Sequence, residues 1–280
     1  MPRVIVLGSI NTDQETLVPT FPKPGEKVVG TSLSRHAGGK GANQAVAARA
    51  QGAEVIMVGA VGDDPAGRSA LNMLFAHGIK LQVERIAQVP TGQAIIWSDG
   101  QANAIVVVPG ANAKVGPNPL RPIHGMGPED LLLTQLETPV DVVAGAVRYA
   151  RKYGARVMVN AAPYADLPAD VIEAADPLVI PAADLPAFEA SGVRPASLVV
   201  LHGKAGLDWD GERFAGPVVA DDEVVDTVGA TDALIGALAA AIAGGAERAT
   251  AARTALGAAA DNVRHAGSQP DPRLRPALSE

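Results

Sequence analysis

A short run of small residues in the last quarter of the chain carries a carboxylate where phosphoryl chemistry could use it. The run is Asp226-Thr227-Val228-Gly229-Ala230-Thr231-Asp232, and an Ala-rich stretch that we expect to be helical follows it. Such a turn would direct backbone N–H groups and the positive end of the helix at one point, where they could stabilise a phosphoryl group in transfer. Asp232 could accept the proton of the attacking hydroxyl, or it could serve only as a helix cap.

A glycine-rich segment earlier in the chain offers hydrogen-bond donors that suit sugar hydroxyls. It reads Gly38-Gly39-Lys40-Gly41-Ala42-Asn43-Gln44 and opens a predicted helix over residues 38–50. Glycines let a ligand approach the backbone, and we expect the N–H groups of the first helical turn to be free to donate. Lys40 and Asn43 add side-chain donors. The alternative is a plain glycine turn, and the spacing of a GxxxxGK[ST] phosphate loop is absent.

Further polar side chains follow predicted strands. Asn11 and Asp13 come just after an apolar run at residues 4–7, and Glu137 comes directly after another at 131–136. In an open α/β sheet, ligands gather beyond the carboxyl ends of the strands, so these three residues could lie near one another. The alternatives are an Asx turn at Asn11 and Asp13, and a solvated loop carboxylate at Glu137.

The hydrophobic pattern predicts a scaffold in which strands and helices alternate. Further strands are expected at residues 54–61, 156–160, 178–180 and 198–201, and further helices at 65–76, 139–153, 230–243 and 247–263. Strands separated by helices indicate βαβ units and a mainly parallel sheet. We therefore expect one α/β domain over residues 1–280.

Two segments do not fit this alternation. Residues 13–35 contain several prolines and a stretch of strand character at Val28–Ser32. Residues 94–108 contain two strands joined across Asp99-Gly100, a dipeptide typical of tight turns. Together they could form a small sheet that projects from the main domain. A second hairpin is expected around Asp210-Gly211.

Composition excludes several classes of function. The chain has 280 residues, a net charge of −7 and no basic run, so nucleic acid is not an expected partner. It has no cysteine, which excludes disulfides and thiolate chemistry, and its five histidines lack the spacing of a metal site. No stretch approaches the roughly 20 apolar residues of a membrane span, and no secretory signal is visible. We expect a cytoplasmic protein without a membrane partner.

Taken in order along the chain, these motifs resemble the ribokinase family of sugar kinases. The segments that carry the resemblance are 8–13 (GSINTD), 24–26 (PGE), 38–44 (GGKGANQ), 62–64 (GDD), 135–137 (QLE) and 226–232 (DTVGATD). The resemblance implies a three-layer α/β/α sandwich around the mainly parallel sheet, with segments 13–35 and 94–108 as a small β lid. It also implies transfer of the γ-phosphoryl of ATP to a sugar, with D-ribose as the first expected acceptor.

The resemblance implies a role for each motif residue. Those that would contact the sugar are Asn11, Asp13, Gly39, Lys40, Asn43, Glu137 and Asp232. Asp232 would be the general base, and the amides of Gly229, Ala230, Thr231 and Asp232 would form the anion hole. On the nucleotide side stand Gly203, Lys204, Gly206 and Asp184, with Mg²⁺ on the phosphates, and Asp226 and Val228 would hold a monovalent cation such as K⁺. Lids of this kind often pair two subunits, which implies a homodimer.

The sequence departs from the family on the nucleotide side. Thr231 replaces a glycine of the family's G-A-G-D signature, which would cost about 1–3 kcal/mol of strain if that position needs a positive φ. Residues 182–185 read Ala-Ala-Asp-Leu where the family has N-x-x-E, and Asp184 is the one polar residue that could substitute. The chain from Leu185 to Leu198 is short, and Asp271 stands where a small polar residue usually helps to hold the cation.

Two hypotheses of different classes follow. The first is an active kinase for ribose, or for another sugar or a nucleoside, supported by the complete set of sugar residues and by Asp232. The second is a sugar-binding protein that descends from a kinase and has lost its nucleotide chemistry, supported by the departures around Thr231 and residues 182–185. Sugar-stimulated turnover of ATP would distinguish the two.

Overall fold

The computed structural model describes residues 3–100, 102–116 and 120–270, which form a large and a small sheet with helices around the large one. The strands are β1 (Arg3–Leu7), β2 (Asn11–Leu17), β3 (Ser32–Gly38), β4 (Glu54–Gly62), β5 (Lys80–Ile86), β6 (Gly92–Ser98), β7 (Asn103–Val108), β8 (Asp130–Thr134), β9 (Arg156–Asn160), β10 (Leu178–Pro181), β11 (Leu198–Leu201), β12 (Leu207–Trp209) and β13 (Glu212–Phe214). The α-helices are α1 (Lys40–Ala50), α2 (Pro65–Ala76), α3 (Val140–Lys152), α4 (Ala169–Ala174), α5 (Leu185–Glu189), α6 (Ala230–Ala243) and α7 (Arg248–Asn262).

The central strands of the large sheet are buried on both faces, which explains why β1, β4, β8 and β10 are nearly continuous apolar runs. Val4 and Val6 of β1 pack into one hydrophobic core with α1, α2, α6 and α7. Ile5 and Leu7 point to the opposite face and pack with α3, α4 and α5. Side chains of one strand thus enter two separate cores, and the predicted three-layer α/β/α architecture is confirmed.

The order of the strands brings the carboxyl ends of β1 and β8 together. The nine strands run in the order β13-β12-β11-β10-β9-β8-β1-β4-β5, and every neighbouring pair from β11 to β5 is parallel. Only the hairpin of β12 and β13 is antiparallel to its neighbours. The sheet is therefore mainly parallel, as predicted, and its carboxyl edge is the place where ligands bind in folds of this type.

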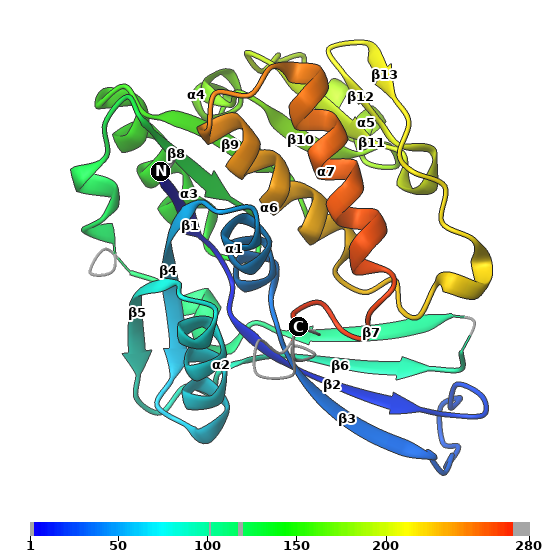
Figure 1. Cartoon of the computed structure of the whole chain (residues 1–280). Helices are drawn as coiled ribbons and strands as arrows, with labels where there is room; N and C mark the ends of the chain where they lie inside the picture. The colour runs from blue at the N-terminus through cyan, green and yellow to red at the C-terminus, as the bar shows by residue number, and fades with distance from the viewer. Residues whose placement is uncertain (1–2, 101, 117–119, 271–280) are drawn as a thin grey trace, which may run out of the picture.

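The small sheet has the order β3-β2-β6-β7 and extends away from the helices α1, α6 and α7 at the lower end of the molecule (Figure 1). Its strands span Asn11–Gly38 and Gly92–Val108, slightly wider than the predicted segments 13–35 and 94–108. The strand predicted at Val28–Ser32 is wrong, because this segment is irregular and β3 starts at Ser32. Pairing across the sheet decides the register, since Asn11 opposes Gly38 and Leu17 opposes Ser32.

Helices α1 and α6 approach each other closely at a glycine. A Cβ added at Gly236 would lie 2.6 Å from the Cβ of Ala47 and 2.9 Å from the amide nitrogen of Ala48, and it would overlap the carbonyl oxygen of Gln44. Only a glycine on α6 allows this separation. The close approach brings the first turns of α1 and α6 together at the base of the small sheet, where the predicted site residues lie.

Candidate active site

The structure brings Asp232 to the start of α1. Asp232 lies in the first turn of α6, is 8% exposed and accepts a hydrogen bond on each carboxylate oxygen. The side-chain amide of Asn43 donates to Oδ2 over 3.0 Å, and that of Gln44 donates to Oδ1 over 2.9 Å. The pKa of Asp232 is raised, mainly by burial and to a smaller extent by the charge of Glu137. The charge of Lys40 and the two hydrogen bonds act in the opposite direction and lower it. Asp232 therefore lies within electrostatic reach of Lys40 and Glu137.

Asp13 belongs to the same electrostatic cluster. Burial, and then the charges of Glu137 and Asp232, raise its pKa to about 7, while a backbone hydrogen bond at Ala94 and the charge of Lys40 lower it. Its Oδ1 is buried and has no hydrogen-bond partner among the described residues. A buried acceptor of this kind suits a ligand that brings its own hydroxyl donors.

The N–H groups at the start of α1 are not free, which contradicts the expectation from the glycine-rich segment. The amide of Lys40 donates to Glu137 Oε2 over 3.3 Å. The amide of Gly41 donates to Ser9 Oγ over 3.4 Å, and Ser9 Oγ in turn donates to Glu137 Oε2. The amide of Ala42 donates to the carbonyl of Ser9 over 2.9 Å. Ser9 and Glu137 thus cap α1 and occupy the amides of Lys40, Gly41 and Ala42.

Gly39 is the residue that makes this arrangement possible. It has φ +89°, and a Cβ added there would lie 2.8 Å from the amide nitrogen of Asn11 and 2.9 Å from the carbonyl oxygen of Ser9. The chain passes so close to the end of β1 that no side chain fits. The role of Gly39 in the structure is close backbone approach, and the predicted sugar contact at this residue stays a prediction.

Gly39→Ala is expected to reduce the free energy of unfolding by about 3 kcal/mol, because strain at positive φ adds to a backbone clash. Gly52, at the other end of the same helix, is the matched control. It has φ +87° but nothing within 4 Å of an added Cβ, so Gly52→Ala should cost only about 1 kcal/mol. Urea unfolding of both variants measures the difference. Equal decreases in the free energy of unfolding would contradict a close backbone approach at Gly39.

Asn11 is oriented by a residue that sequence reasoning missed. Asn112 is 2% exposed, and its amide donates to Asn11 Oδ1 over 2.7 Å while its Oδ1 accepts the amide of Ile10 over 2.9 Å. This contact orients the Asn11 amide, so that its NH₂ group can be offered to a ligand. No local pattern marks Asn112, which lies in a short 3-10 helix (Gly110–Lys114) after β7 and reaches Asn11 only in the folded chain.

Both polar atoms of the Asn43 side chain form hydrogen bonds within the protein. Its Nδ2 donates to Asp232, and its Oδ1 accepts hydrogen bonds from Ser268 Oγ over 3.1 Å and Gln269 Nε2 over 2.8 Å. Gln44, Gln135 and Asn160 also form a buried chain of hydrogen bonds behind Asp232. Gln44 and Gln135 lie inside the motifs quoted above, whereas nothing in the sequence singles out Asn160.

The start of α6 has the geometry of an anion site. Gly229 adopts φ +81° as the residue before the helix, and Ala230, Thr231 and Asp232 follow as its first turn. Among the described residues, no acceptor is found for the amides of Thr231 and Asp232. Thr231 is exposed and has no positive φ, so its replacement of glycine causes no backbone strain and leaves its amide available.

The predicted nucleotide-side residues follow the next strands of the sheet. Asp184 precedes the five-residue α5 after β10, and Gly203, Lys204 and Gly206 form the loop after β11. Lys204 is exposed and its Nζ lies 3.4 Å from Asp221 Oδ1. Between β10 and β11 the described chain contains α5 and no additional strand, in agreement with the short stretch from Leu185 to Leu198.

The predicted cation residues form part of a loop contact. Asp226 Oδ1 accepts the amide of Val228 and Oδ2 accepts the amide of Gly267, each over 2.9 Å. The cation site at Asp226 and Val228 stays a prediction, and Asp271 lies outside the described residues.

Within residues 3–100, 102–116 and 120–270, no three His, Asp or Glu side chains gather so that they could hold a metal ion. In the same part of the chain, no helix has both the length and the apolar character to cross a bilayer.

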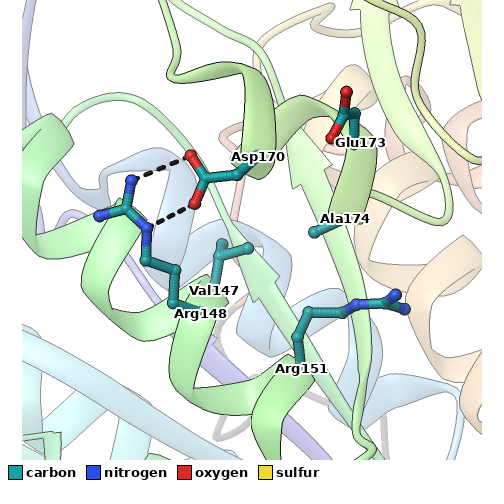
Figure 2. Close-up of a pocket in the computed structure, with 6 residues that line it drawn as sticks. All are labelled: Val147, Arg148, Arg151, Asp170, Glu173 and Ala174. Carbon is teal, nitrogen blue, oxygen red and sulfur yellow. Dashed lines mark hydrogen bonds and ion pairs between the residues drawn. The ribbon is translucent and has the colours of Figure 1, made fainter.

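A surface depression lies far from this cluster, between α3 and α4 on the opposite face of the large sheet (Figure 2). Arg148 and Asp170 line it and pair with each other through two hydrogen bonds of 2.5 and 2.9 Å. Figure 2 shows Arg151 and Glu173 on its other side. None of the predicted site residues lines this depression, so the candidate site is the cluster around Asp232.

Comparison with known proteins relates this cluster to a family. Residues 1–274 match the model of the pfkB family carbohydrate kinases. The chain is 36% identical over 280 residues to a ribokinase of Bacillus subtilis (strain 168), an alignment that covers 96% of this chain and 95% of that protein. It is 32% identical over 163 residues to a deoxyribokinase of Salmonella typhi, which covers 57% of this chain and 53% of that protein.

A solved structure gives the same relationship. A ribokinase of Arabidopsis thaliana complexed with ribose and ATP is 26% identical and superposes with a TM-score of 0.84 over 97% of this chain and 96% of that chain. The similarity therefore extends over both the large sheet and the small one.

Proposed function

Because the chain belongs to the pfkB family of carbohydrate kinases, we propose that it transfers the γ-phosphoryl of ATP to a hydroxyl of a pentose. D-ribose is the first acceptor, and D-ribose 5-phosphate is its product. The observation that carries the proposal is the buried carboxylate of Asp232, which lies within electrostatic reach of Lys40 and Asp13 and in the first turn of α6, where the amides of Thr231 and Asp232 have no acceptor among the described residues. The relatives named ribokinase and the ribose in the Arabidopsis structure support a pentose.

Asp13, Asn11 and Lys40 would bind the sugar. The unpartnered Oδ1 of Asp13 can accept from a hydroxyl, and the NH₂ of Asn11 and the ammonium of Lys40 can donate to one. Donors and acceptors from β2 and α1 would then meet the sugar from two sides. The small sheet would cover it and exclude water, so that the phosphoryl goes to the sugar and is not hydrolysed.

Asp232 would act as the general base. Its carboxylate accepts the proton of the attacking hydroxyl while the oxygen bonds to the γ-phosphorus, and the bond from that phosphorus to the β–γ bridging oxygen breaks to release ADP. The amides of Thr231 and Asp232 would stabilise the charge on the transferred group. The hydroxyl of Thr231, exposed at the same turn, adds one donor that a glycine lacks.

The nucleotide would lie along the loops after β10 and β11. The exposed ammonium of Lys204 and the turns at Gly203 and Gly206 can approach phosphates, and Asp184 lies on the adjacent loop. Mg²⁺ would be carried mainly by the phosphates of ATP, because the described residues form no cage of three acidic or imidazole ligands. Bound there, it would neutralise phosphate charge. A monovalent cation at Asp226 and Val228 would fix the loop that precedes α6.

Steady-state assays with a panel of acceptors test this function. With ATP, Mg²⁺ and K⁺, we expect ribose to give the highest kcat/KM among ribose, 2-deoxyribose, fructose and inosine. A higher kcat/KM for another acceptor would retain the kinase and change its substrate. Sugar binding without any ATP turnover would replace the proposal by the non-catalytic alternative.

We further propose that the small sheet pairs two copies of the chain. The edge strand β7 exposes apolar side chains on both faces, since Ile105 is 55% and Val106 is 53% exposed. An exposed apolar edge strand is otherwise prone to aggregation, and a second copy would cover it.

The double variant Ile105→Lys, Val106→Lys is expected to be monomeric, because two lysines on β7 make its burial against another subunit unfavourable. Sedimentation velocity should find the unmodified protein as a dimer. Val218→Lys, at a position that is 94% exposed but lies outside the small sheet, is the control and should remain dimeric. A monomeric wild type, or a dimeric double variant, would contradict this proposal.

A further inference from the structure

A row of buried side-chain amides ends at Asp232. Gln44 and Gln135 are fully buried and Asn160 is 1% exposed. Gln135 Nε2 donates to Gln44 Oε1 over 2.6 Å, and Gln44 Nε2 donates both to Asp232 Oδ1 over 2.9 Å and to Asn160 Oδ1 over 3.1 Å. The four residues come from α1, the end of β8, β9 and α6, so only the folded chain assembles this row.

The hydrogen bonds determine which end of each side-chain amide in this row donates and which end accepts. An ionised Asp232 can only accept, so the NH₂ group of Gln44 must face it. The oxygen of Gln44 then faces Gln135, which must donate, and the second N–H of Gln44 meets the oxygen of Asn160. If the amide of Gln44 turned over, two oxygens would face each other beside Asp232 and again beside Asn160. The anchors on Gln44 therefore prevent the rotation that would remove a donor from Asp232.

Gln44 also opposes the electrostatic cost of burying a carboxylate. Burial raises the pKa of Asp232, and the hydrogen bond from Gln44 is one of three influences that lower it, with the charge of Lys40 and the hydrogen bond from Asn43. A general base must be ionised to accept a proton at neutral pH. Gln44 is fully buried and donates directly to the carboxylate, so its direct route to the reaction is through Asp232.

We infer that Gln44 is a positioning residue for the general base: it holds the carboxylate of Asp232 in place for proton transfer, and Gln135 holds the amide of Gln44 in the orientation that this requires. The inference rests on the function proposed above. It differs from a purely structural role, in which Gln44 would only fasten α1 to α6. That role predicts a loss of stability with no change in the proton affinity of Asp232.

Gln44→Met keeps the length of the side chain and removes its hydrogen bonds. We expect the acid limb of the kcat/KM profile to move to higher pH by about 1 unit, because an unassisted buried carboxylate binds its proton more tightly. At pH 7, kcat should fall by about 10-fold to 100-fold, and the KM of the sugar should change by no more than about 3-fold. Gln51→Met, at the exposed end of α1, is the control and should retain the wild-type profile.

A second variant and a second readout keep the test decisive. Gln135→Met should shift the pH profile in the same direction by a smaller amount. It takes the place of Gln44→Met in the test if that variant does not fold. Carbon-13 NMR titration of the Asp232 carboxyl, assigned with Asp232→Asn, measures its pKa without turnover. An unchanged pKa and an unchanged acid limb in both variants would overturn the inference. A raised pKa in a protein that phosphorylates no sugar would retain the inference about Asp232 and reject the proposed function.

Discussion

Asp232→Asn is expected to reduce kcat by about 10³-fold while sugar binding stays within a few-fold of wild type. Asparagine matches aspartate in shape but cannot accept the proton of the attacking hydroxyl, and general-base catalysis contributes about 10²-fold to 10⁴-fold. Because asparagine brings its own NH₂ group, it also disturbs one of the two donors at this site, Asn43 or Gln44. Stopped-time assays of sugar phosphate give kcat, and calorimetric titration with ribose gives affinity.

Asp130→Asn is the matched control for this substitution. Asp130 is also a buried aspartate, 5% exposed, but it lies at the opposite end of β8 from Glu137 and pairs with Arg3. Its replacement should lower stability and leave kcat unchanged. If Asp232→Asn kept kcat within 10-fold of wild type, Asp232 would be a helix cap and not the base.

Asp13→Asn is expected to stabilise the unliganded protein at pH 8. The pKa of Asp13 is about 7, raised by burial and by the charges of Glu137 and Asp232, against an ordinary value of 3.8. Between these two values the folded state binds more protons than the unfolded state, so the contribution of Asp13 to stability falls as the pH rises and levels off only above about pH 8. Removing the charge should add about 4 kcal/mol at pH 8 and almost nothing near pH 4.

The same substitution should weaken ribose binding by about 100-fold at pH 8, since a hydrogen bond to an ionised acceptor is lost. Urea unfolding at pH 4 and pH 8, with calorimetry at pH 8, measures both effects. Asp64 provides a control of opposite sign. Burial raises its pKa, but hydrogen bonds from Thr91 and Gly67 outweigh this and lower it, so Asp64→Asn should cost stability at neutral pH. An Asp13→Asn protein that is less stable than wild type at pH 8 would contradict the charge cluster.

The parts of the fold that local signals determine could be predicted from the sequence. Helix α2 begins and ends where predicted, because Asp64 caps it through the amide of Gly67, Pro65 occupies its first turn and Gly78 follows it. Strand β5 was not predicted, since its charged residues hide the apolar alternation of an edge strand. Strand β3 was predicted too early, because its position depends on pairing with β2 and local propensity carries no information about a partner.

The candidate site, like the fold, was predictable where local motifs carry the information and not where it depends on tertiary contacts. Asp232, Asn43 and Lys40 stand in motifs whose residue types indicate their chemistry, and the fold brings these motifs together. The amides of α1 were expected to be free, but Ser9 and Glu137 occupy them through contacts more than thirty and about one hundred residues away along the chain. Asn112 and Asn160 could not be predicted, because each acts through partners that only the tertiary structure supplies.

One measurement tests the central claim most directly. Phosphorus-31 NMR would follow a mixture of ribose, ATP, Mg²⁺ and K⁺ with the wild-type protein and, in parallel, with Asp232→Asn. We predict a growing sugar phosphate resonance, matched in amount by ADP, with the wild type and none above background with the variant. Release of inorganic phosphate without sugar phosphate, or equal rates of sugar phosphate formation by the two proteins, would contradict the assignment of Asp232 as the base of a sugar kinase.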